Sequence, residues 1–213
     1  METPFIYELR KPGTEGRGKT YPAIFLMHGM GSNEQDIMAL ANGLAQDIYI
    51  FSIRGPIAQP PGFSYFTIEG FGKPHRAVFD ETIQKLSAFI DHAISTYAIN
   101  PEKVFLGGFS QGAILSMVLG LTMGTRVKGV IALSGYIPAF VKEAYTIQSI
   151  SHLQVFISHG EQDPAFPIAW GEANRDYFSE LGATVSFHAY PEGHTISREN
   201  YRDFQAWLDQ ELL

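Results

Sequence analysis

The chain has 213 residues, of which 45% are hydrophobic and 17% are charged. These proportions are those of an ordinary globular protein and exclude extensive disorder, and the length leads us to expect a single domain, 1–213, with a sizeable core. Fifteen Lys and Arg residues against 22 Asp and Glu residues give a formal net charge of −7, with no basic run, so no nucleic-acid partner is expected.

The residue types that are missing exclude further classes of protein. There is no cysteine, which excludes disulfides, thiolate metal sites and a cysteine nucleophile. No pair of histidines has metal-ligand spacing, so neither a catalytic metal nor a cofactor is expected. The first residues lack the basic start and apolar core of a signal peptide, and no apolar run is long enough to span a membrane. We therefore expect a cytoplasmic protein without a membrane span.

Short apolar runs alternate with amphipathic stretches along the chain. Strands are predicted, in chain order, over 5–9, 21–27, 48–53, 104–109, 127–133, 153–158 and 185–190. Helices are predicted over 34–46, 76–97, 113–119, 169–181 and 197–213. The intervening segments include a Gly- and charge-rich loop over 11–20, a Pro-, Gly- and aromatic-rich segment over 54–75 with no period of its own, and a variable stretch over 134–151.

This alternation predicts an α/β fold in which helices cover both faces of a mostly parallel central sheet. Ligands on such sheets bind at the carboxyl ends of the strands. The most polar loops of the chain all follow predicted strands. We therefore expect any functional site at that edge of the sheet.

A serine boxed by glycines lies where one predicted strand gives way to a helix. The residues from Gly108 to Gly112 read Gly-Phe-Ser-Gln-Gly and fit the G-x-S-x-G nucleophile elbow, a sharp turn that holds a serine hydroxyl above the sheet. The pattern alone is common and also fits an ordinary turn. The strand before it and the buried helix after it favour the elbow, which makes Ser110 the candidate nucleophile.

Serine needs a histidine to accept its proton and an acid to orient that histidine. Asp163 and His194 follow two successive predicted strands, so both are expected at the same sheet edge as Ser110. Their order along the chain, Ser, Asp, His, is the order found in α/β-hydrolases. We predict that these three residues form a catalytic triad.

The other histidines and loop carboxylates are weaker candidates. His159 precedes the acid, which is the wrong order, and packing or hydrogen bonding under the loop fits it better. Glu161 and Glu192 fit solvated loop carboxylates. A structural role is expected for the remaining histidines, which are His28, His75, His92, His152 and His188.

Attack on a carbonyl group creates an oxyanion, which requires preorganised N–H donors. Gln111 begins the predicted elbow helix, where its N–H points toward the growing charge and the helix dipole assists. Met30 lies between Gly29 and Gly31 after the strand at 21–27, and the glycines allow this loop to turn an amide inward. An ordinary turn is the alternative for the Met30 loop.

Several segments together carry a resemblance to a known family. They are Leu26-Met27-His28-Gly29-Met30-Gly31, Arg54-Gly55-Pro56, Gly108-Phe109-Ser110-Gln111-Gly112-Ala113, His159-Gly160-Glu161-Gln162-Asp163-Pro164 and Gly193-His194. Nearly end to end, the sequence resembles the phospholipase/carboxylesterase family of serine hydrolases, which includes bacterial carboxylesterases and acyl-protein thioesterase-like enzymes. The resemblance implies a minimal α/β-hydrolase fold and hydrolysis of carboxylic esters, with Ser110, Asp163 and His194 as triad and Met30 and Gln111 as oxyanion donors.

The resemblance does not extend to the substrate, because 59–67 carries no motif of the family. Aromatic residues could wall the cleft or simply anchor long loops, and the two interpretations are equally consistent with the sequence. The candidates for substrate binding are Phe63, Tyr65, Phe66, Phe71, Phe166 and Trp170. No cluster of Arg or Lys is available to hold an anionic head group, and Arg54 fits a structural ion pair or loop hydrogen bond.

We therefore predict a serine carboxylesterase that hydrolyses small, uncharged or modestly apolar esters through an acyl-enzyme. A thioesterase or lysophospholipase on the same site is the nearer alternative, since the leaving group decides between them. A catalytically silent α/β-hydrolase-fold protein that binds a small ligand is an alternative of another class. It would explain the fold but not three retained triad residues.

Overall fold

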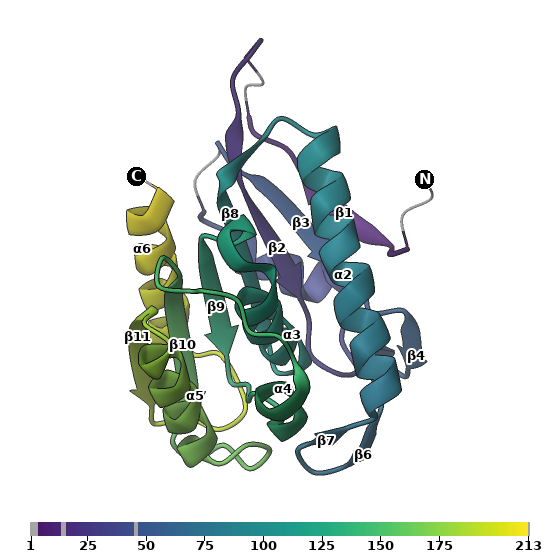
Figure 1. Cartoon of the computed structure of the whole chain (residues 1–213), viewed down its shortest axis with the longest axis vertical. Coiled ribbons are helices and arrows are strands. Elements are labelled where there is room, and N and C mark those ends of the chain that lie inside the picture. Colours follow the sequence, from purple (N-terminus) through teal and green to yellow (C-terminus); the bar gives the residue numbers. More distant parts are fainter. Residues whose placement is uncertain (1–3, 14–15, 45–46, 213) are drawn as a thin grey trace.

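The centre of the molecule is a seven-stranded sheet (Figure 1). The computed structural model describes residues 4–13, 16–44 and 47–212. Across the sheet the strands lie in the order β1 (Tyr7–Arg10), β3 (Tyr49–Ile53), β2 (Tyr21–Met27), β8 (Ile99–Phe109), β9 (Gly129–Leu133), β10 (Gln154–Gly160) and β11 (Thr184–Tyr190). β1 runs antiparallel to β3, and the other neighbouring pairs are parallel. The predicted mostly parallel sheet is confirmed.

Helices cover both faces because alternate side chains of the buried strands point in opposite directions. In β2, Phe25 belongs to the apolar cluster under α2 (Arg76–Thr96), α3 (Gln111–Met123) and α5 (Ile168–Glu180). The next residue, Leu26, belongs to the cluster under α1 (Glu34–Met38) and α6 (Arg198–Leu212). These helices form one layer on each face of the sheet (Figure 1), as the alternation of predicted strands and helices requires.

The helix predicted over 34–46 is shorter in the structure. Asn33 caps α1 by accepting hydrogen bonds from the N–H groups of Gln35 and Asp36. The chain then tightens into the 3₁₀ helix η1 (Ala39–Ala41) and turns at Gly43 with φ of 87°, a conformation that ends a helix. The predicted residues 45–46 lie outside the described part of the chain.

The segment 54–75, predicted to lack strand periodicity, contains two small hairpins. β4 (Ile57–Gln59) pairs with β5 (Gly62–Ser64), and β6 (Ile68–Gly70) pairs with β7 (Lys73–Pro74). Strands this short cannot show an alternating pattern, so the sequence did not indicate them. The variable stretch 134–151 contains the short helix α4 (Ala139–Ala144), and η2 (Gly124–Arg126) follows α3.

Three further predicted features reach residues that the structure does not describe. They are the first residues of the chain, the middle of the loop at 11–20 and Leu213 of the last predicted helix. The organisation of 1–213 as one domain stays a prediction. Within residues 4–13, 16–44 and 47–212, no helix combines the length and apolar character needed to cross a membrane.

Candidate active site

Ser110 occupies the sharp turn between β8 and α3. Its φ of 56° lies in the left-handed region, which a residue with a Cβ atom adopts only when the surrounding structure compensates for the strain. The N–H of Ser110 donates to the carbonyl oxygen of Leu133 at 3.0 Å. This hydrogen bond fixes the turn to the end of β9.

The glycines on either side of Ser110 let β8, α3 and β2 approach closely. A Cβ atom at Gly112 would lie 1.8 Å from the carbonyl oxygen of Met27, and one at Gly108 would lie 2.5 Å from the same oxygen. Non-bonded atoms cannot approach each other this closely, so a side chain at either position would force the backbone to move. Close backbone packing therefore requires glycine at both positions.

Ser110, His194 and Asp163 form a continuous chain of hydrogen bonds. Nε2 of His194 lies 2.9 Å from Oγ of Ser110, and Nδ1 lies 2.7 Å from Oδ2 of Asp163. The His194 ring packs between Phe109, at 4.7 Å between ring centroids, and Phe166, at 5.1 Å. A serine hydroxyl paired in this way with an oriented imidazole can be activated for nucleophilic attack.

The loop after β10 holds the Asp163 carboxylate in place. The side chain is completely buried, and its Oδ1 accepts hydrogen bonds from the N–H groups of Ala165 at 2.8 Å and Phe166 at 2.9 Å. Beneath it, His159 directs Nε2 to the carbonyl oxygen of Phe166 at 2.9 Å. Burial lowers the pKa of His159, so a neutral ring with the proton on Nε2 supports the loop.

Two backbone N–H groups lie close to Ser110. Gln111 begins α3, and the loop that carries Met30 lies so close that a Cβ atom at Gly29 would be 3.2 Å from Cβ of Ser110. Among the described residues, neither Met30 nor Gln111 donates its backbone N–H to another protein group. Both amides are therefore available to a bound ligand.

The side chain of Gln111 fixes the segment that follows β5. Its Oε1 accepts from the N–H of Tyr65 at 2.9 Å, and its Nε2 donates to the carbonyl oxygen of Phe66 at 2.8 Å. The elbow and the aromatic segment are thereby held together. The glutamine after Ser110 thus has a structural use that its backbone position alone does not suggest.

His28 is buried beneath the Met30 loop. Its Nε2 accepts from the N–H of Gly55 at 2.9 Å, and its Nδ1 lies 2.7 Å from the carbonyl oxygen of Gly29. Burial lowers the pKa of His28, so the ring is neutral. This agrees with the buried hydrogen-bonding role expected for His28.

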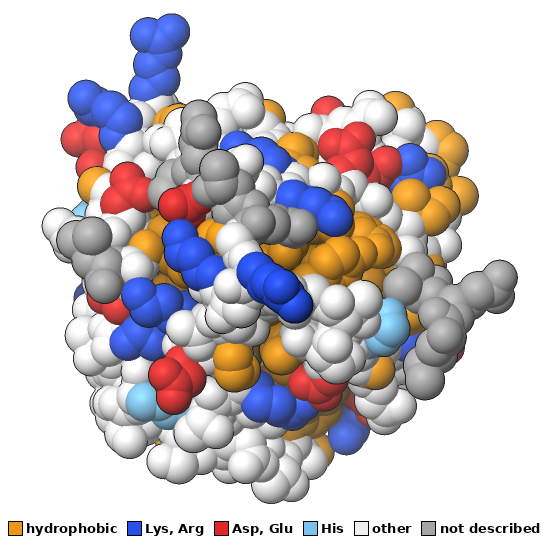
Figure 2. Space-filling view, turned by 90° about the horizontal axis from the view of Figure 1, so that it is seen from above, with side chains coloured by type: hydrophobic (Ala, Val, Ile, Leu, Met, Phe, Trp, Pro, Cys, Tyr) orange, Lys and Arg blue, Asp and Glu red, His pale blue; other side chains and the backbone are white. Residues whose placement is uncertain are grey.

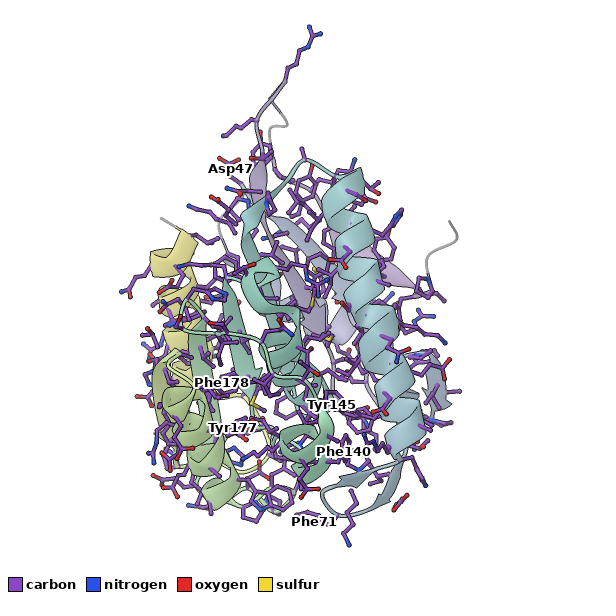
Figure 3. The ribbon with its side chains drawn as sticks, viewed as in Figure 1. Asp47, Phe71, Phe140, Tyr145, Tyr177 and Phe178 are labelled. Carbon is purple, nitrogen blue, oxygen red and sulfur yellow. The ribbon has the colours of Figure 1, made fainter. Side chains whose placement is uncertain are left out.

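Ser110 and His194 open into a pocket of about 300 Å³. Of the residues singled out in the sequence, those that line it are Met30, Phe66, Phe71, Ser110, Gln111, Phe166 and His194. Phe71 lies at the tip of the β6–β7 hairpin, at the lower end of the molecule in Figure 3. Apolar side chains thus surround the polar groups of the site.

Three predicted substrate-binding residues lie elsewhere. The ring of Phe63 lies under the guanidinium group of Arg54, 4.6 Å away, and Tyr65 is fully buried with its hydroxyl on the carbonyl oxygen of Ile53. Trp170 packs behind Phe71 at 5.0 Å and borders an adjoining pocket of about 210 Å³. These side chains support the walls of the site rather than line the pocket of Ser110.

Five further lining residues were not predicted from the sequence. They are Ile68, Gly72, Ile114, Tyr136 and Ala165. Tyr136 follows the end of β9 and Ala165 follows the loop of Asp163, so both come after a strand, at the edge where ligands were expected. Their position could have indicated them. Ile68 and Gly72 belong to the β6–β7 hairpin, whose fold the sequence pattern did not reveal.

An ion pair joins Arg54 and Glu34. Arg54 donates to the carboxylate of Glu34 from Nε at 2.6 Å and also from Nη2. Arg54 lowers the pKa of Glu34, and the pair is the structural contact expected for this arginine. In the described residues there is no group of three or more His, Asp or Glu side chains that could hold a metal ion.

A larger hollow of about 590 Å³ lies at the opposite end, lined by Lys19, Asp47, Lys103 and Asp209 among others. Figure 3 labels Asp47 at this upper end, far from Phe71. In Figure 2, which views this end, basic and acidic side chains are interspersed with apolar ones. The elbow, the paired His194 and Asp163, and the free N–H groups all lie at the other end, which makes that end the candidate active site.

Comparisons with known proteins agree with this fold. The sequence model of the family described as Phospholipase/Carboxylesterase matches residues 14–212. Acyl-protein thioesterase 1 of Debaryomyces hansenii is 31% identical over 169 residues, which cover 74% of this chain and 72% of that protein. The putative hydrolase MhqD of Bacillus subtilis is 25% identical over 202 residues, covering 92% and 97%. The Bacillus cereus carboxylesterase structure has a TM-score of 0.87 at 21% identity and covers 99% of this chain and 96% of that one.

The parallel sheet, its two helical layers and the serine elbow define an α/β-hydrolase. The chain belongs to the phospholipase/carboxylesterase family. It is a hydrolase of the esterase or thioesterase type.

Proposed function

We propose that this protein is a serine carboxylesterase that hydrolyses small, uncharged or modestly apolar carboxylic esters. The observation that carries the proposal is the hydrogen-bonded chain from Oγ of Ser110 through His194 to Asp163, at the base of a largely apolar pocket. In this proposal Ser110 is the nucleophile, His194 the general base and acid, and Asp163 the residue that orients the imidazole.

The reaction proceeds in two halves. Nε2 of His194 accepts the hydroxyl proton as Oγ of Ser110 bonds to the ester carbonyl carbon. The C–O bond to the alcohol then breaks, and His194 returns the proton to the leaving oxygen. Water, deprotonated by the same imidazole, attacks the acyl carbon. The bond between that carbon and Oγ of Ser110 then breaks, and His194 returns the proton to Oγ, which releases the acid and free Ser110. Asp163 stays ionised and accepts from the Nδ1–H throughout.

The negative charge of each tetrahedral intermediate falls on the former carbonyl oxygen. The free N–H groups of Met30 and Gln111 stabilise it, and the N-terminal end of α3 adds its dipole. The strained turn at Ser110 and the glycine packing at Gly108 and Gly112 hold these groups in fixed positions before the substrate arrives. Such preorganisation is what makes hydrogen bonds to a transition state effective.

The size and lining of the pocket support small substrates. About 300 Å³ is at the lower end of the range for small-molecule sites. Phe66, Phe71 and Phe166 provide apolar walls. No Lys or Arg is among the described residues that line the pocket, so an anionic head group would find no counter-ion there.

Thioester hydrolysis is the second candidate. It is favoured by the likeness to acyl-protein thioesterase 1, and the same nucleophile and oxyanion donors serve either leaving group. A lysophospholipase would require a longer pocket. A catalytically inactive protein that only binds a ligand would not need the hydrogen-bonded arrangement of Ser110, His194 and Asp163.

A panel of substrates tests the proposal. We expect p-nitrophenyl acetate and butanoate to be hydrolysed with higher kcat/KM than p-nitrophenyl laurate or palmitate, and a peptide amide to be left intact. The matched pair of an ethyl ester and an ethyl thioester of butanoic acid compares the two leaving groups. A maximum at long acyl chains, a requirement for anionic esters or turnover of the thioester alone would contradict the proposal.

A cytoplasmic location, the lack of a nucleic-acid partner and the lack of a cofactor stay predictions from the sequence.

A further inference from the structure

The wall of the pocket of Ser110 includes Tyr136, whose side chain carries a hydroxyl group. The residue lies between β9 and α4 and is only 6% exposed, yet it lines the pocket. Its hydroxyl group makes no hydrogen bond to any described residue. The hydroxyl group is therefore left to pair with a ligand or a solvent molecule.

The position of Tyr136 is fixed by its neighbours. Asn174, 2% exposed, donates to the carbonyl oxygen of Gly135 at 2.9 Å and accepts from the N–H of Ile137 at 3.1 Å. The backbone is thereby held on both sides of Tyr136. Phe166 and Trp170 pack edge-on against the ring, with centroids 5.0 and 4.9 Å away. The hydroxyl group is thus presented by a rigid support.

The other polar side chains of the pocket are already engaged. Ser110 and His194 bond to each other, and the Gln111 amide is held by the backbone of 65–66. Burial raises the pKa of Tyr136 to about 12, so its hydroxyl remains protonated and can donate. Within the described lining, Tyr136 is therefore the polar side chain left free to recognise a substrate.

Tyr136 also lies at the boundary between two pockets. Tyr136 and Gly72 line both the pocket of Ser110 and the adjoining pocket of about 210 Å³. Glycine is required at this boundary, because a Cβ atom at Gly72 would lie 2.8 Å from the Trp170 ring.

We propose that Tyr136 determines substrate specificity by donating a hydrogen bond to a neutral oxygen acceptor, an ether or ketone oxygen, carried on one arm of the ester. The preferred substrates are then small esters with an oxygenated acyl or alcohol arm, not plain alkyl esters. This inference rests on the proposed esterase function and names its substrate class.

The test compares wild type and Tyr136→Phe on substrates that differ only in an oxygen replacing a methylene group. For the acyl arm the pair is p-nitrophenyl 4-methoxybutanoate and p-nitrophenyl hexanoate. For the alcohol arm it is 2-methoxyethyl butanoate and butyl butanoate. In each pair the ratio of kcat/KM values is taken for both enzymes and the two ratios are compared, because intrinsic reactivity then cancels.

We expect the ether-to-methylene ratio to fall about threefold to tenfold in Tyr136→Phe for one arm, the value of one neutral hydrogen bond. The melting temperature should be preserved, since the hydroxyl group bonds to no described residue, and the test depends on the change in the ratio rather than on the turnover of either ester alone. Tyr145→Phe is the matched control. It removes a hydroxyl group that donates to Asp80 and lines neither pocket, so it should leave both ratios unchanged.

Each result decides the matter. A fall confined to one arm identifies the arm that lies against Tyr136. An unchanged ratio for both arms, or an equal loss on ether and methylene substrates, overturns the inference while the esterase function stands. If wild type hydrolyses none of the four esters, the proposed function itself fails.

Discussion

The backbone N–H of Gly55 donates to Nε2 of His28 at 2.9 Å, which places the ring proton on Nδ1. Nδ1 then donates to the carbonyl oxygen of Gly29 at 2.7 Å. In a trans peptide the carbonyl oxygen and the following N–H point in opposite directions. By holding the Gly29 carbonyl, His28 therefore sets the direction of the Met30 N–H, the proposed oxyanion donor.

We predict that His28→Leu lowers kcat by roughly 10²-fold, the cost of losing an oxyanion donor, with a smaller change in KM. His28→Asn should retain more activity, since its amide N–H lies near the position of Nδ1 and can still donate to Gly29. Steady-state kinetics on p-nitrophenyl butanoate measure both variants. Equal loss in the two variants, or a change in KM alone, would contradict a role in orienting Met30.

Close packing at the elbow gives a prediction about stability. In Gly112→Ala the new Cβ atom would lie 1.8 Å from the carbonyl oxygen of Met27, so β2 and α3 must separate. We expect a loss of about 3 kcal/mol or more in the free energy of unfolding, measured by urea denaturation. The control is Gly70→Ala, where nothing lies within 4 Å of the new atom. Similar stabilities for the two variants would show that the elbow is not tightly packed.

The two buried neutral histidines make stability depend on pH. Burial lowers the pKa values of His28 and His159, so the unfolded chain binds more protons than the folded one below about pH 6.5. Their contribution is fully present above that pH and is lost as the pH falls toward the folded pKa values. We expect the free energy of unfolding to fall between pH 6.5 and 5, by up to about 1.4 kcal/mol per pH unit for each histidine.

The variant that checks this dependence is His159→Gln, which retains a donor for the Phe166 carbonyl but does not titrate. Thermal or urea denaturation at pH 5, 6.5 and 8 should give a shallower decline below pH 6.5 than in wild type. The absolute stability of the variant does not enter the comparison, because only the slope is used. An identical slope would mean that His159 is not protonated on unfolding in this range.

The acid of the proposed triad is tested by Asp163→Asn. Oδ1 of Asp163 accepts two backbone N–H groups, while Oδ2 accepts from His194. An amide cannot accept at both positions, so the imidazole would rotate or take the wrong tautomer. We expect kcat to fall by roughly 10³-fold or more with KM little changed. Retention of most of the activity would show that His194 is oriented by other groups.

The sequence predicted the features that depend on long periodic patterns. The strand at 21–27, the helix at 76–97 and the mostly parallel sheet have the predicted positions, since many residues contribute to each pattern. The hairpins β4–β5 and β6–β7 were missed because strands of two or three residues carry no period. The helix at 34–46 was predicted too long, since the apolar face continues through η1 although the backbone tightens there.

The site shows the same division. Ser110, Asp163 and His194 were predicted as a triad from their order along the chain and their positions in loops. The structure places these three side chains within hydrogen-bonding distance of one another along the chain Ser110–His194–Asp163. The pocket walls depend on how the β6–β7 hairpin folds over the sheet edge, which no local pattern encodes. Tyr136 was overlooked, although it lies three residues after the end of β9, at the edge of the sheet where ligands were expected.

The most direct test of the central claim is to react the protein with a fluorophosphonate and to map the adduct by peptide mass spectrometry. We expect one modification, on Ser110, with parallel loss of esterase activity, and neither labelling nor turnover in Ser110→Ala. Ser95→Ala, a change on the exposed surface of α2, should behave as wild type. An adduct on another residue, or retained turnover in Ser110→Ala, would contradict the account.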